Sequence, residues 1–440
     1  MQTIAIFGAG KSASHLINYL GKICANNQWK LLVADTNIAL STSKTEKFPD
    51  AEAFSFDVSD KEKRQSFIEK ANLVISMLPP ALHLLIARDC INFSKHFLTA
   101  SYIDMNLRAF ADDIAAKQLL FIGEMGLDPG IDHMSAMKLI DRIKKQGGQI
   151  TSFKSHCGGL MAPESDDNPW HYKISWNSAN VVAAGNSGAY YKSEGKIKEV
   201  LYPQIFADPG QVVDVPGLGT LAWYANRDSL SYLETYGLHK INTFIRTTLR
   251  YPAFCRGWNK LIHLGLTNQN DHHEIKNCKT FSEWFSLKMN KHANDIQLSE
   301  DFSDAEFNAQ IDYIGLRSND YLPVPITNSA TLLRQLLEKN LAMKAADKDM
   351  VVLLHEIEYT SGNNSKKAIK STLIVKGEDK IHTAMAKTVG LPLGIAARLI
   401  LENKIQLTGL HIPVLPEIYE PVLSELENNG ITFNEQEYDI

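Results

Sequence analysis

The sequence has few cysteines, and none of them are paired at the spacing of metal ligands. The five cysteines are odd in number, scattered, and never spaced as Cys-x-x-Cys. This pattern argues against a disulfide framework and against a zinc site. We therefore expect reduced thiols and no bound metal. The five residues are Cys24, Cys90, Cys157, Cys255 and Cys278.

A surplus of basic residues and a membrane-length apolar run are also missing. The chain has 45 Lys+Arg against 50 Asp+Glu and a net charge of -5, which argues against a nucleic-acid partner. The most apolar long run, 72–87, contains two prolines and a histidine and would cross a bilayer poorly, and no other run comes closer. The first residues, MQTIAIFGAG, have no basic segment, so we expect no export signal and a cytoplasmic protein without a membrane partner.

What the sequence does contain is typical of a folded enzyme. Hydrophobic residues make up 44% and charged residues 22% of the 440 positions, which excludes disorder for most of the chain. At about 150 residues per domain, the length predicts two or three domains.

The first third of the chain alternates short apolar strands with helices. Mostly apolar strands joined by helices predict a parallel sheet covered on both faces, and right-handed crossovers make it doubly wound. We therefore predict an α/β fold with a Rossmann-variant, doubly wound parallel sheet. The expected strands are 3–7, 30–34, 51–56, 72–78, 96–100 and 119–123, and the expected helices are 11–27, 60–70, 81–93 and 105–117.

The rest of the chain changes character after a helix expected at 134–145. Residues 150–250 are β-rich with long polar loops, 350–360 and 370–377 form an expected antiparallel pair, and 383–403 predicts one or two apolar helices interrupted at Pro392. These patterns predict a second α/β domain with a mixed sheet and a small helical insert. The predicted boundaries are 1–130 with 383–440 for the dinucleotide-binding domain, 131–264 with 350–382 for the second domain, and 265–349 for the insert.

Directly after the first strand, residues 8–13 match G-x-G-x-x-A and open a helix. Gly8 permits the tight turn, Gly10 lets the backbone approach a pyrophosphate, and Ala13 allows close helix packing. The helix N-terminus then offers amide donors to the phosphates. In this strand–turn–helix context the motif favours a dinucleotide site over a turn without a ligand.

Asp35 closes the second strand, 22 residues after Ala13. A carboxylate there accepts hydrogen bonds from ribose hydroxyls and repels a 2′-phosphate, which favours NAD, with NADP still possible. The alternative is a surface aspartate that caps the next helix. Lys11 in the glycine turn either contacts phosphate or is solvated, and Asp57 after the third strand either faces the adenine or caps the following helix.

The segment GLDPGIDH, 126–133, follows the last expected parallel strand. Its proline and glycines predict a sharp preset loop that presents Asp128 near a nicotinamide. The equally weighted alternative is a simple turn with Asp132 as a helix cap.

The polar segment 157–176 is long for a loop without function. Single histidines such as His133, His156 and His171 are more often hydrogen-bonded residues than ligands, and Cys157 is more often inert than nucleophilic. Arg227 and Arg250 stand in apolar or aromatic stretches and suit bidentate carboxylate binding, although surface ion pairs are the commoner role.

Four blocks together resemble the L-glutamate-forming saccharopine dehydrogenase family. They are GLDPGIDHMSAM, SHCGGLMAPESDDNPWHYKISW, ANRDSLSYLETYGL and TTLRYPAFCRGWNKLIHLGL, in that order, and the similarity covers nearly the whole chain except for a weaker part at 267–345. The resemblance implies a Rossmann-variant domain, a saccharopine-binding α/β domain that also forms a homodimer, and a helical insert. It further implies NAD(P)-dependent interconversion of saccharopine and water with L-glutamate and 2-aminoadipate 6-semialdehyde, in lysine metabolism.

The same resemblance implies positions for ligand contacts. Implied cofactor contacts are Ala9, Gly10, Lys11, Ser12, Ala34, Asp35, Thr36, Asp57, Val58, Leu78, Ala100, Ser101, Leu127, Asp128, Pro129 and Ser175. Implied substrate contacts are Ser101, Tyr102, Asp128, Arg227, Thr248, Leu249 and Arg250.

The chain departs from the family pattern at a few positions. NADP-using members carry Arg where this chain has Asp35, which agrees with the charge argument for NAD. His156 stands where the family usually has Tyr, Met161 where it has Pro, and Ala225 where Pro precedes NRD. The direction of the reaction in the cell stays open.

A general acid/base is needed for proton transfer at the substrate nitrogen, and we name Asp128, Tyr102 and then Cys157 as candidates. One alternative is a dehydrogenase of another secondary amine, such as carboxynorspermidine or homospermidine, although Arg227 and Arg250 argue against a polyamine. Another is a non-catalytic regulator that binds NAD(H).

Overall fold

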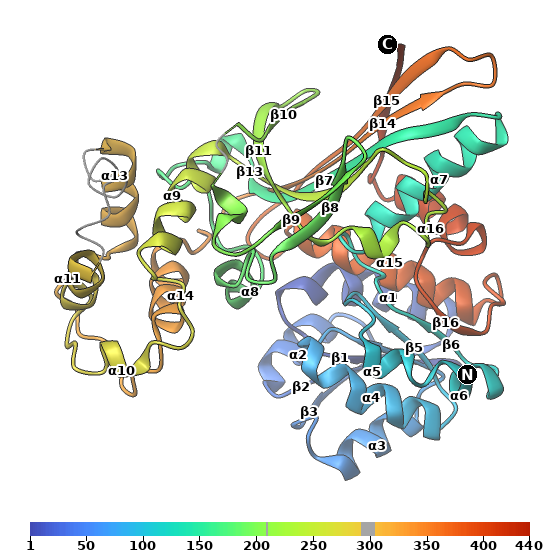
Figure 1. The fold of residues 1–440 in the computed structure, drawn as a ribbon. Coiled ribbons are helices and arrows are strands. Elements are labelled where there is room, and N and C mark those ends of the chain that lie inside the picture. Colours follow the sequence, from blue (N-terminus) through green and yellow to red (C-terminus); the bar gives the residue numbers. More distant parts are fainter. Residues whose placement is uncertain (208–209, 292–303) are drawn as a thin grey trace. The chain divides into compact units, whose positions relative to one another are not determined.

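The structure is a computed structural model of the chain and describes residues 1–207, 210–291 and 304–440 (Figure 1). The chain forms two compact units. Unit 1 comprises Met1–Gly148 and Ile381–Phe433, and unit 2 comprises Gln149–Lys380 and Asn434–Ile440.

Unit 1 is built on a seven-stranded parallel sheet in the order β16-β6-β5-β4-β1-β2-β3. Six of these strands follow the 3-2-1-4-5-6 order of a doubly wound dinucleotide-binding sheet. The predicted parallel sheet and its six N-terminal strands are therefore confirmed. The strands are β1 (Thr3–Phe7), β2 (Lys30–Asp35), β3 (Ala51–Ser55), β4 (Leu73–Ser76), β5 (His96–Thr99), β6 (Leu120–Ile122) and β16 (Gly409–His411).

Helices cover both faces of this sheet (Figure 1). On one face, apolar side chains of α3, α4 and α6 form a core with Phe7, Val74 and Phe97 of the strands. The helical elements of unit 1 are η1 (Lys11–Ala13), α1 (Ser14–Asn27), α2 (Ile38–Thr45), α3 (Lys61–Glu69), α4 (Pro80–Asn92), α5 (Met105–Arg108), α6 (Ala111–Ala116), α7 (Ile131–Lys145), α15 (Ala384–Leu401) and α16 (Pro416–Asn428).

Helix α15 is continuous through Pro392, so the predicted interruption there is wrong. A proline removes one helical hydrogen bond, but close packing on α1 holds the helix together. A Cβ on Gly390 would lie 2.9 Å from Leu16 N, and one on Gly394 would lie 2.8 Å from the Tyr19 ring. Two glycines thus let α15 lie directly on α1.

The same helix corrects a second expectation, that no segment comes closer to a membrane span than the run 72–87. Among the described helices it alone is long and apolar enough to cross a membrane, with a mean hydropathy of 1.4. Its window is 78% buried inside the protein, which is typical of a core helix.

The helix predicted at 105–117 is two helices, α5 and α6. The chain leaves helical geometry at Phe110 (φ −98°, ψ 9°), whose ring packs against the core of unit 1 and lies under Arg88.

Unit 2 is built on a ten-stranded mixed sheet, which confirms the predicted mixed sheet. Its main path is β10-β11-β13-β7-β14-β15-β17, and β13 and β7 are parallel while the other pairs on this path are antiparallel. The strands are β7 (Gln149–Met161), β8 (Ala189–Ser193), β9 (Lys196–Val200), β10 (Val212–Val215), β11 (Gly219–Ala225), β12 (Arg227–Asp228), β13 (Thr243–Arg250), β14 (Asp349–Thr360), β15 (Lys366–Lys376) and β17 (Asn434–Asp439).

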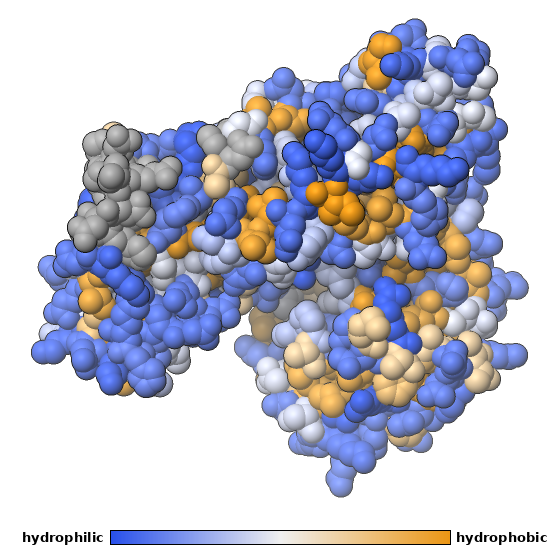
Figure 2. Space-filling model, viewed as in Figure 1, coloured by the Kyte–Doolittle hydropathy of each residue, from blue (hydrophilic) through white to orange (hydrophobic). Residues whose placement is uncertain are grey.

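The helices of unit 2 bury their apolar sides in one core that contains Trp170, Trp258 and Trp284. In the view of Figure 2, the surface of α10, α11 and α14 is largely hydrophilic, in line with that burial. Part of the predicted insert, 292–303, lies outside the described residues. The helical elements are η2 (Pro163–Ser165), α8 (Ser178–Val182), η3 (Gln204–Phe206), η4 (Leu230–Tyr232), α9 (Pro252–His263), α10 (His272–Ile275), α11 (Phe281–Lys291), α13 (Ala305–Ile314) and α14 (Ser329–Asn340).

The two units differ from the predicted domains at α7, at β17 and in the insert, since the described residues of 265–349 belong to unit 2 and form no separate unit. Helix α7 belongs to unit 1, where Tyr419 of α16 donates a hydrogen bond to Asp141 at 2.7 Å. Strand β17 was assigned to the dinucleotide domain, but it pairs antiparallel with β15 in unit 2. Its polar sequence, NEQEYD, is exposed along its length and gives no apolar alternation from which a strand could be predicted.

Candidate functional site

The glycine turn of unit 1 lies where the strand order of the parallel sheet reverses. Strand β1 has β2 on one side and β4 on the other, and ligands of doubly wound sheets bind at the carboxyl ends of the strands at this point. Gly8 has φ 98°, and a Cβ there would lie 3.2 Å from Met77 O and 3.3 Å from Leu78 Cδ2. The fold itself therefore requires glycine at position 8.

Gly10 is different, because the fold does not require it. Its φ is −64°, and a Cβ there would meet nothing within 4 Å. It precedes η1 and is exposed, so its main chain is open to an approaching ligand. The residues present thus fit the pyrophosphate of a dinucleotide, which needs open space beside amide donors.

We expect Gly10→Ala to weaken dinucleotide binding about tenfold or more while leaving the free energy of unfolding nearly unchanged, because the added methyl group occupies ligand space only. Fluorescence titration with NADH and NADPH, beside urea denaturation, measures the two effects. Equal dinucleotide affinity in Gly10→Ala and the parent protein would remove the glycine turn from the site.

Asp35 is the last residue of β2, where the sequence places it, and its carboxylate is fixed by main-chain hydrogen bonds. Its Oδ2 accepts the Ala9 N–H at 2.8 Å, and its Oδ1 accepts the Asn37 N–H at 2.9 Å. The N-cap of α2 is Asn37, so the capping alternative for Asp35 is wrong. Thr36 follows Asp35 on the exposed side of this turn.

A lysine that was not assigned to the site lies beside the glycine turn. Lys44 Nζ donates to Gly10 O at 2.5 Å, and burial lowers the pKa of Lys44 to about 8 although Asp35 raises it. Lys11, by contrast, is exposed at the first position of η1.

Asp57 is exposed after β3 and does not cap α3, whose N-cap is Asp60. A hydrogen bond from Ser59 N–H, 2.8 Å long, lowers the pKa of Asp57. Val58 is buried in the core of unit 1, and Leu78 packs partly against it. Ser12 and Ala34 lie on η1 and β2, at the same edge of the sheet.

The loop after β6 forms the tight turn that its sequence predicts. Gly126 N–H donates to Pro129 O at 3.0 Å, and Ile131 N–H donates to Gly126 O at 2.9 Å. Asp128 is half-buried at this turn, while Leu127 and Pro129 are buried. A Cβ added to Gly126 would lie 3.0 Å from the Cβ of Ala100, which places the loop after β5 against this turn.

Two buried carboxylates and a buried histidine form hydrogen bonds at this turn. Glu124 Oε2 lies 3.0 Å from His133 Nε2, and its Oε1 accepts the Ile103 N–H at 3.3 Å. Asp132 Oδ1 accepts the Gly130 N–H at 2.6 Å. Asp132 lies inside the first turn of α7 and is not its N-cap, because the N-cap residue is Gly130. His133 is thus a hydrogen-bonded residue, as predicted, and Glu124 is a support that the sequence analysis missed.

The loop after β5 carries Ser101 and Tyr102, both half-buried. Ser101 Oγ lies 2.8 Å from Nε2 of His83, a buried residue of α4. His83 was not predicted to serve the site, although a histidine inside the apolar run 72–87 is a signal that could have found it.

In unit 2, Arg250 is 4% exposed at the end of β13. Its guanidinium lies 5.3 Å from the ring centre of Tyr172 and 5.5 Å from that of Phe254, and Nη1 donates to Leu249 O at 2.8 Å. Its Nε is buried and has no hydrogen-bond partner among the described residues. A buried, incompletely paired guanidinium is well suited to bind a carboxylate.

The other predicted substrate residues of unit 2 differ in accessibility. Thr248 is half-buried in β13 opposite Cys157 of β7, which is 5% exposed. The side chain of Leu249 is fully buried in a core with Leu160 and Met350, so only its main chain is available to a ligand.

Arg227 is exposed on β12, unlike the buried Arg250. Ser175, predicted to contact the cofactor, is buried in unit 2 next to Ile174, which bridges to Ala342. The structure therefore brings the glycine turn, Asp35, Ser101 and Asp128 to one edge of the unit 1 sheet, and it places Arg250, Thr248 and Cys157 on adjoining strands of unit 2.

His156 is buried on β7 and contacts polar residues of the two neighbouring strands, β13 and β14. Its Nδ1 lies 2.7 Å from Thr247 Oγ1, and its Nε2 lies 3.3 Å from Glu356 Oε2. Burial lowers the pKa of His156, so the imidazole is neutral near pH 7. Burial raises the pKa of Glu356, but hydrogen bonds from His156 and Lys370 lower it overall to about 2.

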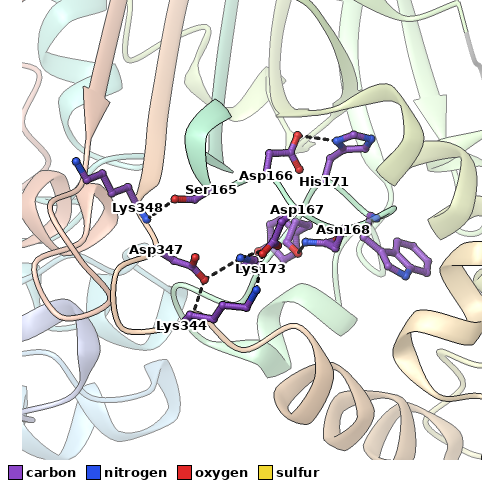
Figure 3. A network of polar contacts seen from close by, with 11 residues as sticks. Ser165, Asp166, Asp167, Asn168, His171, Lys173, Lys344, Asp347 and Lys348 are labelled. Carbon is purple, nitrogen blue, oxygen red and sulfur yellow. Dashed lines mark hydrogen bonds and ion pairs between the residues drawn. The ribbon is translucent and has the colours of Figure 1, made fainter.

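The long polar loop after β7 is held by ion pairs, as Figure 3 shows. Lys173 Nζ lies 2.7 Å from Asp167 Oδ1 and 2.8 Å from Asp347 Oδ2, which ties the loop to the segment before β14. His171 Nδ1 lies 2.6 Å from Asp166 Oδ2, so this histidine is hydrogen-bonded as predicted. The loop also contributes Tyr172, on which Arg250 packs.

Comparisons with known proteins match two family models to consecutive parts of the chain. A model of the saccharopine dehydrogenase NADP binding domain matches residues 4–122, and one of the saccharopine dehydrogenase C-terminal domain matches residues 126–431. The NADP(+)-dependent, L-glutamate-forming saccharopine dehydrogenase of Saccharomyces cerevisiae is 31% identical over 99% of each chain. A solved apo structure of the L-Glu-forming saccharopine dehydrogenase from Saccharomyces cerevisiae matches with a TM-score of 0.87 and 29% identity, covering 100% of both chains.

Longer relatives contain a region like this chain. The α-aminoadipic semialdehyde synthases of Arabidopsis thaliana and Rattus norvegicus are each 33% identical to it over 98% of its length. The chain spans only 44% and 47% of those two proteins, about half their length. Because the C-terminal family model alone covers more than half of the chain and the yeast relative matches it from end to end, this protein belongs to the saccharopine dehydrogenase family.

Proposed function

We propose that the protein is an oxidoreductase that interconverts L-saccharopine and water with L-glutamate and 2-aminoadipate 6-semialdehyde, using a nicotinamide dinucleotide. The observation that carries the proposal is Arg250, a buried guanidinium with an unpaired Nε in the part of the chain that matches the saccharopine dehydrogenase C-terminal domain. Saccharopine is rich in carboxylates, whereas a polyamine substrate would need acidic residues at this place. Arg250 therefore favours saccharopine over carboxynorspermidine or homospermidine.

In the proposed reaction, the carbon beside the secondary amine loses a hydride and the nitrogen loses a proton, which leaves a C=N bond. The dinucleotide supplies the chemistry of hydride acceptance when it is bound. Water then adds across the C=N bond, and the resulting carbinolamine breaks its C–N bond to give the aldehyde and the amino group of glutamate. In the reverse direction, the same steps condense the aldehyde with the amino group of glutamate and then reduce the C=N bond.

Protons must be removed and returned at the substrate nitrogen, and Asp128, Tyr102 and Cys157 stay our candidates in that order. Asp128 and Tyr102 are half-buried, which leaves each of them partly accessible. Cys157 is 5% exposed, and its burial makes it the weakest of the three. The glycine turn of unit 1 orients the dinucleotide, and Arg250 orients the substrate, which accounts for most of the acceleration we expect.

We also propose that NAD is used in preference to NADP, with Asp35 as the reason. The family model and the yeast relative carry NADP in their names and give no support to this preference. The support comes from the fixed carboxylate, which is held by the N–H groups of Ala9 and Asn37 and would repel a 2′-phosphate. A homodimer and a cytoplasmic location also stay predictions.

The experiment is reduced-dinucleotide formation by purified protein from L-saccharopine, with NAD and with NADP. We expect turnover with NAD and much less with NADP. Asp35→Asn removes the charge but keeps an acceptor oxygen, so in this variant the ratio of kcat/KM with NADP to kcat/KM with NAD should rise about tenfold. Turnover with NADP alone would keep the enzyme and overturn the role of Asp35. Dinucleotide binding without any turnover would reject saccharopine as the substrate.

A further inference from the structure

His83 joins the carboxyl ends of two neighbouring strands in unit 1. It lies in the first turn of α4, is 7% exposed, and its ring nitrogens contact hydroxyl groups on both sides. Nδ1 lies 2.8 Å from Ser76 Oγ at the end of β4. Nε2 lies 2.8 Å from Ser101 Oγ and 3.3 Å from Thr99 Oγ1, at and just after the end of β5.

The donor in each of these hydrogen bonds follows from the burial of Ser76 together with its short contact to the ring. Thr99 is also buried, but its hydroxyl lies 3.3 Å from Nε2, against 2.8 Å between Ser76 Oγ and Nδ1, so the stronger hydrogen bond of Ser76 decides the tautomer. This serine is 1% exposed, and among the described residues His83 is the only partner of its hydroxyl group. A buried hydroxyl hydrogen without an acceptor costs more than an unused lone pair. Ser76 therefore donates to Nδ1, which leaves the ring proton of neutral His83 on Nε2.

The imidazole keeps this neutral form at physiological pH. Burial lowers the pKa of His83 to about 4, against an opposing influence of Asp104, which caps α5. A neutral ring has one donor and one acceptor, so the direction fixed at Ser76 decides the direction at Ser101.

Ser101 consequently accepts the Nε2–H of His83. Its main chain is fixed as well, because its N–H donates to Thr99 Oγ1 at 3.2 Å and its C=O accepts Glu124 N–H at 2.9 Å. Ser101 is half-buried, and its own hydroxyl hydrogen has no acceptor among the described residues. That hydrogen is available to a ligand at the carboxyl edge of the sheet.

We propose that His83 is a positioning residue that sets the Ser101 hydroxyl as a hydrogen-bond donor to an acceptor oxygen of the bound ligand. The oxygen belongs to the carboxamide of the dinucleotide or to a carboxylate of the substrate. This inference rests on the proposed function for the identity of the ligands, but the state of His83 itself does not depend on that function.

The first test reads the imidazole directly. Nitrogen-15 NMR of the histidine-labelled full chain, with the His83 signals identified by their loss in His83→Gln, should show a neutral ring protonated on Nε2. In Ser76→Ala, which removes the donor to Nδ1, we expect the signals to shift toward a mixture of the two tautomers. A parent ring protonated on Nδ1 would overturn the proposal.

The second test asks whether His83 acts through Ser101. We expect Ser101→Ala and His83→Leu each to weaken the same ligand about tenfold, and the double variant to bind no more weakly than Ser101→Ala. His83→Gln, which keeps one acceptor and one donor, should recover most of the affinity. Titration of the dinucleotide, and of saccharopine on the complex with reduced dinucleotide, shows which ligand supplies the oxygen.

A merely structural role for His83 predicts a different result. In that case His83→Leu would weaken ligand binding by the same factor in the parent protein and in Ser101→Ala. That result would reject the proposal. Unchanged affinity for both ligands in His83→Leu would reject it too. If the parent protein binds the dinucleotide but does not oxidise saccharopine, the proposed function fails alone, because the NMR and dinucleotide measurements still decide the role of His83.

Discussion

Replacing Arg250 with alanine should weaken saccharopine binding by about 10²–10³-fold, because truncating one partner of a buried charge pair costs roughly 2–5 kcal/mol. The guanidinium is enclosed by Tyr172 and Phe254, so water cannot take over its role when the side chain is removed. Affinity for NADH should stay as it is, because the predicted dinucleotide contacts of the glycine turn are in unit 1. Calorimetric titration of saccharopine on the complex with reduced dinucleotide measures the first quantity, and fluorescence titration measures the second.

Arg256→Ala is the matched control, since it removes the same side chain six positions further along the chain. Arg256 is 49% exposed by side chain and pairs with Glu306 at 2.7 Å, an interaction typical of surface ion pairs. We expect saccharopine affinity to be unchanged in this variant. Equal loss of saccharopine and NADH affinity in Arg250→Ala would instead assign Arg250 to general stability and remove it from the substrate site.

Gly130→Ala should destabilise unit 1 by about 3–5 kcal/mol, the combined cost of a forbidden backbone conformation and a steric clash. Gly130 has φ 146°, and a Cβ there would lie 2.1 Å from Gly126 O and 2.3 Å from Gly126 N. The turn cannot open to relieve this clash without breaking the hydrogen bond from Gly126 N–H to Pro129 O. Because the same turn presents Asp128, activity should be lost together with stability.

The control for this variant is Gly430→Ala, also in unit 1. Gly430 has φ 76°, but only the mobile end of Lys387 comes near an added Cβ, at 3.5 Å. Gly430→Ala should therefore lower the free energy of unfolding only by the cost of the left-handed backbone conformation, about 1–2 kcal/mol. Denaturation monitored by hydrogen exchange over residues 1–148 separates the two variants, and an equal loss in both would show that the close approach of Gly126 does not matter.

The dinucleotide-binding half of the fold was predictable because its determinants are local. Gly8, Gly10 and Asp35 stand at fixed distances from an apolar strand, and a turn, a strand end and a helix start depend on residues within a few positions of each other. Right-handed crossovers then place helices on both faces of the parallel sheet. For the same reason the antiparallel pair β14 and β15, joined by a short turn, was predicted correctly.

The errors arose where a distant part of the chain overrides the local pattern. Pro392 predicts a break, yet α15 continues because Gly390 and Gly394 lay it on α1. The polar residues 434–439 show no strand pattern, yet they form β17 because β15 offers an unpaired edge. In each case the stabilising contacts join residues far apart in sequence.

The residue types of the site were therefore determined by the sequence, and their state was decided by the tertiary structure. Asp35, Asp128 and Arg250 could be named from spacing and resemblance. That Arg250 is buried with an unpaired nitrogen, and that His83 contacts Ser101 across 18 positions, could not. Burial and hydrogen-bond direction depend on which strands become neighbours, and periodicity along one strand carries no information about its neighbour.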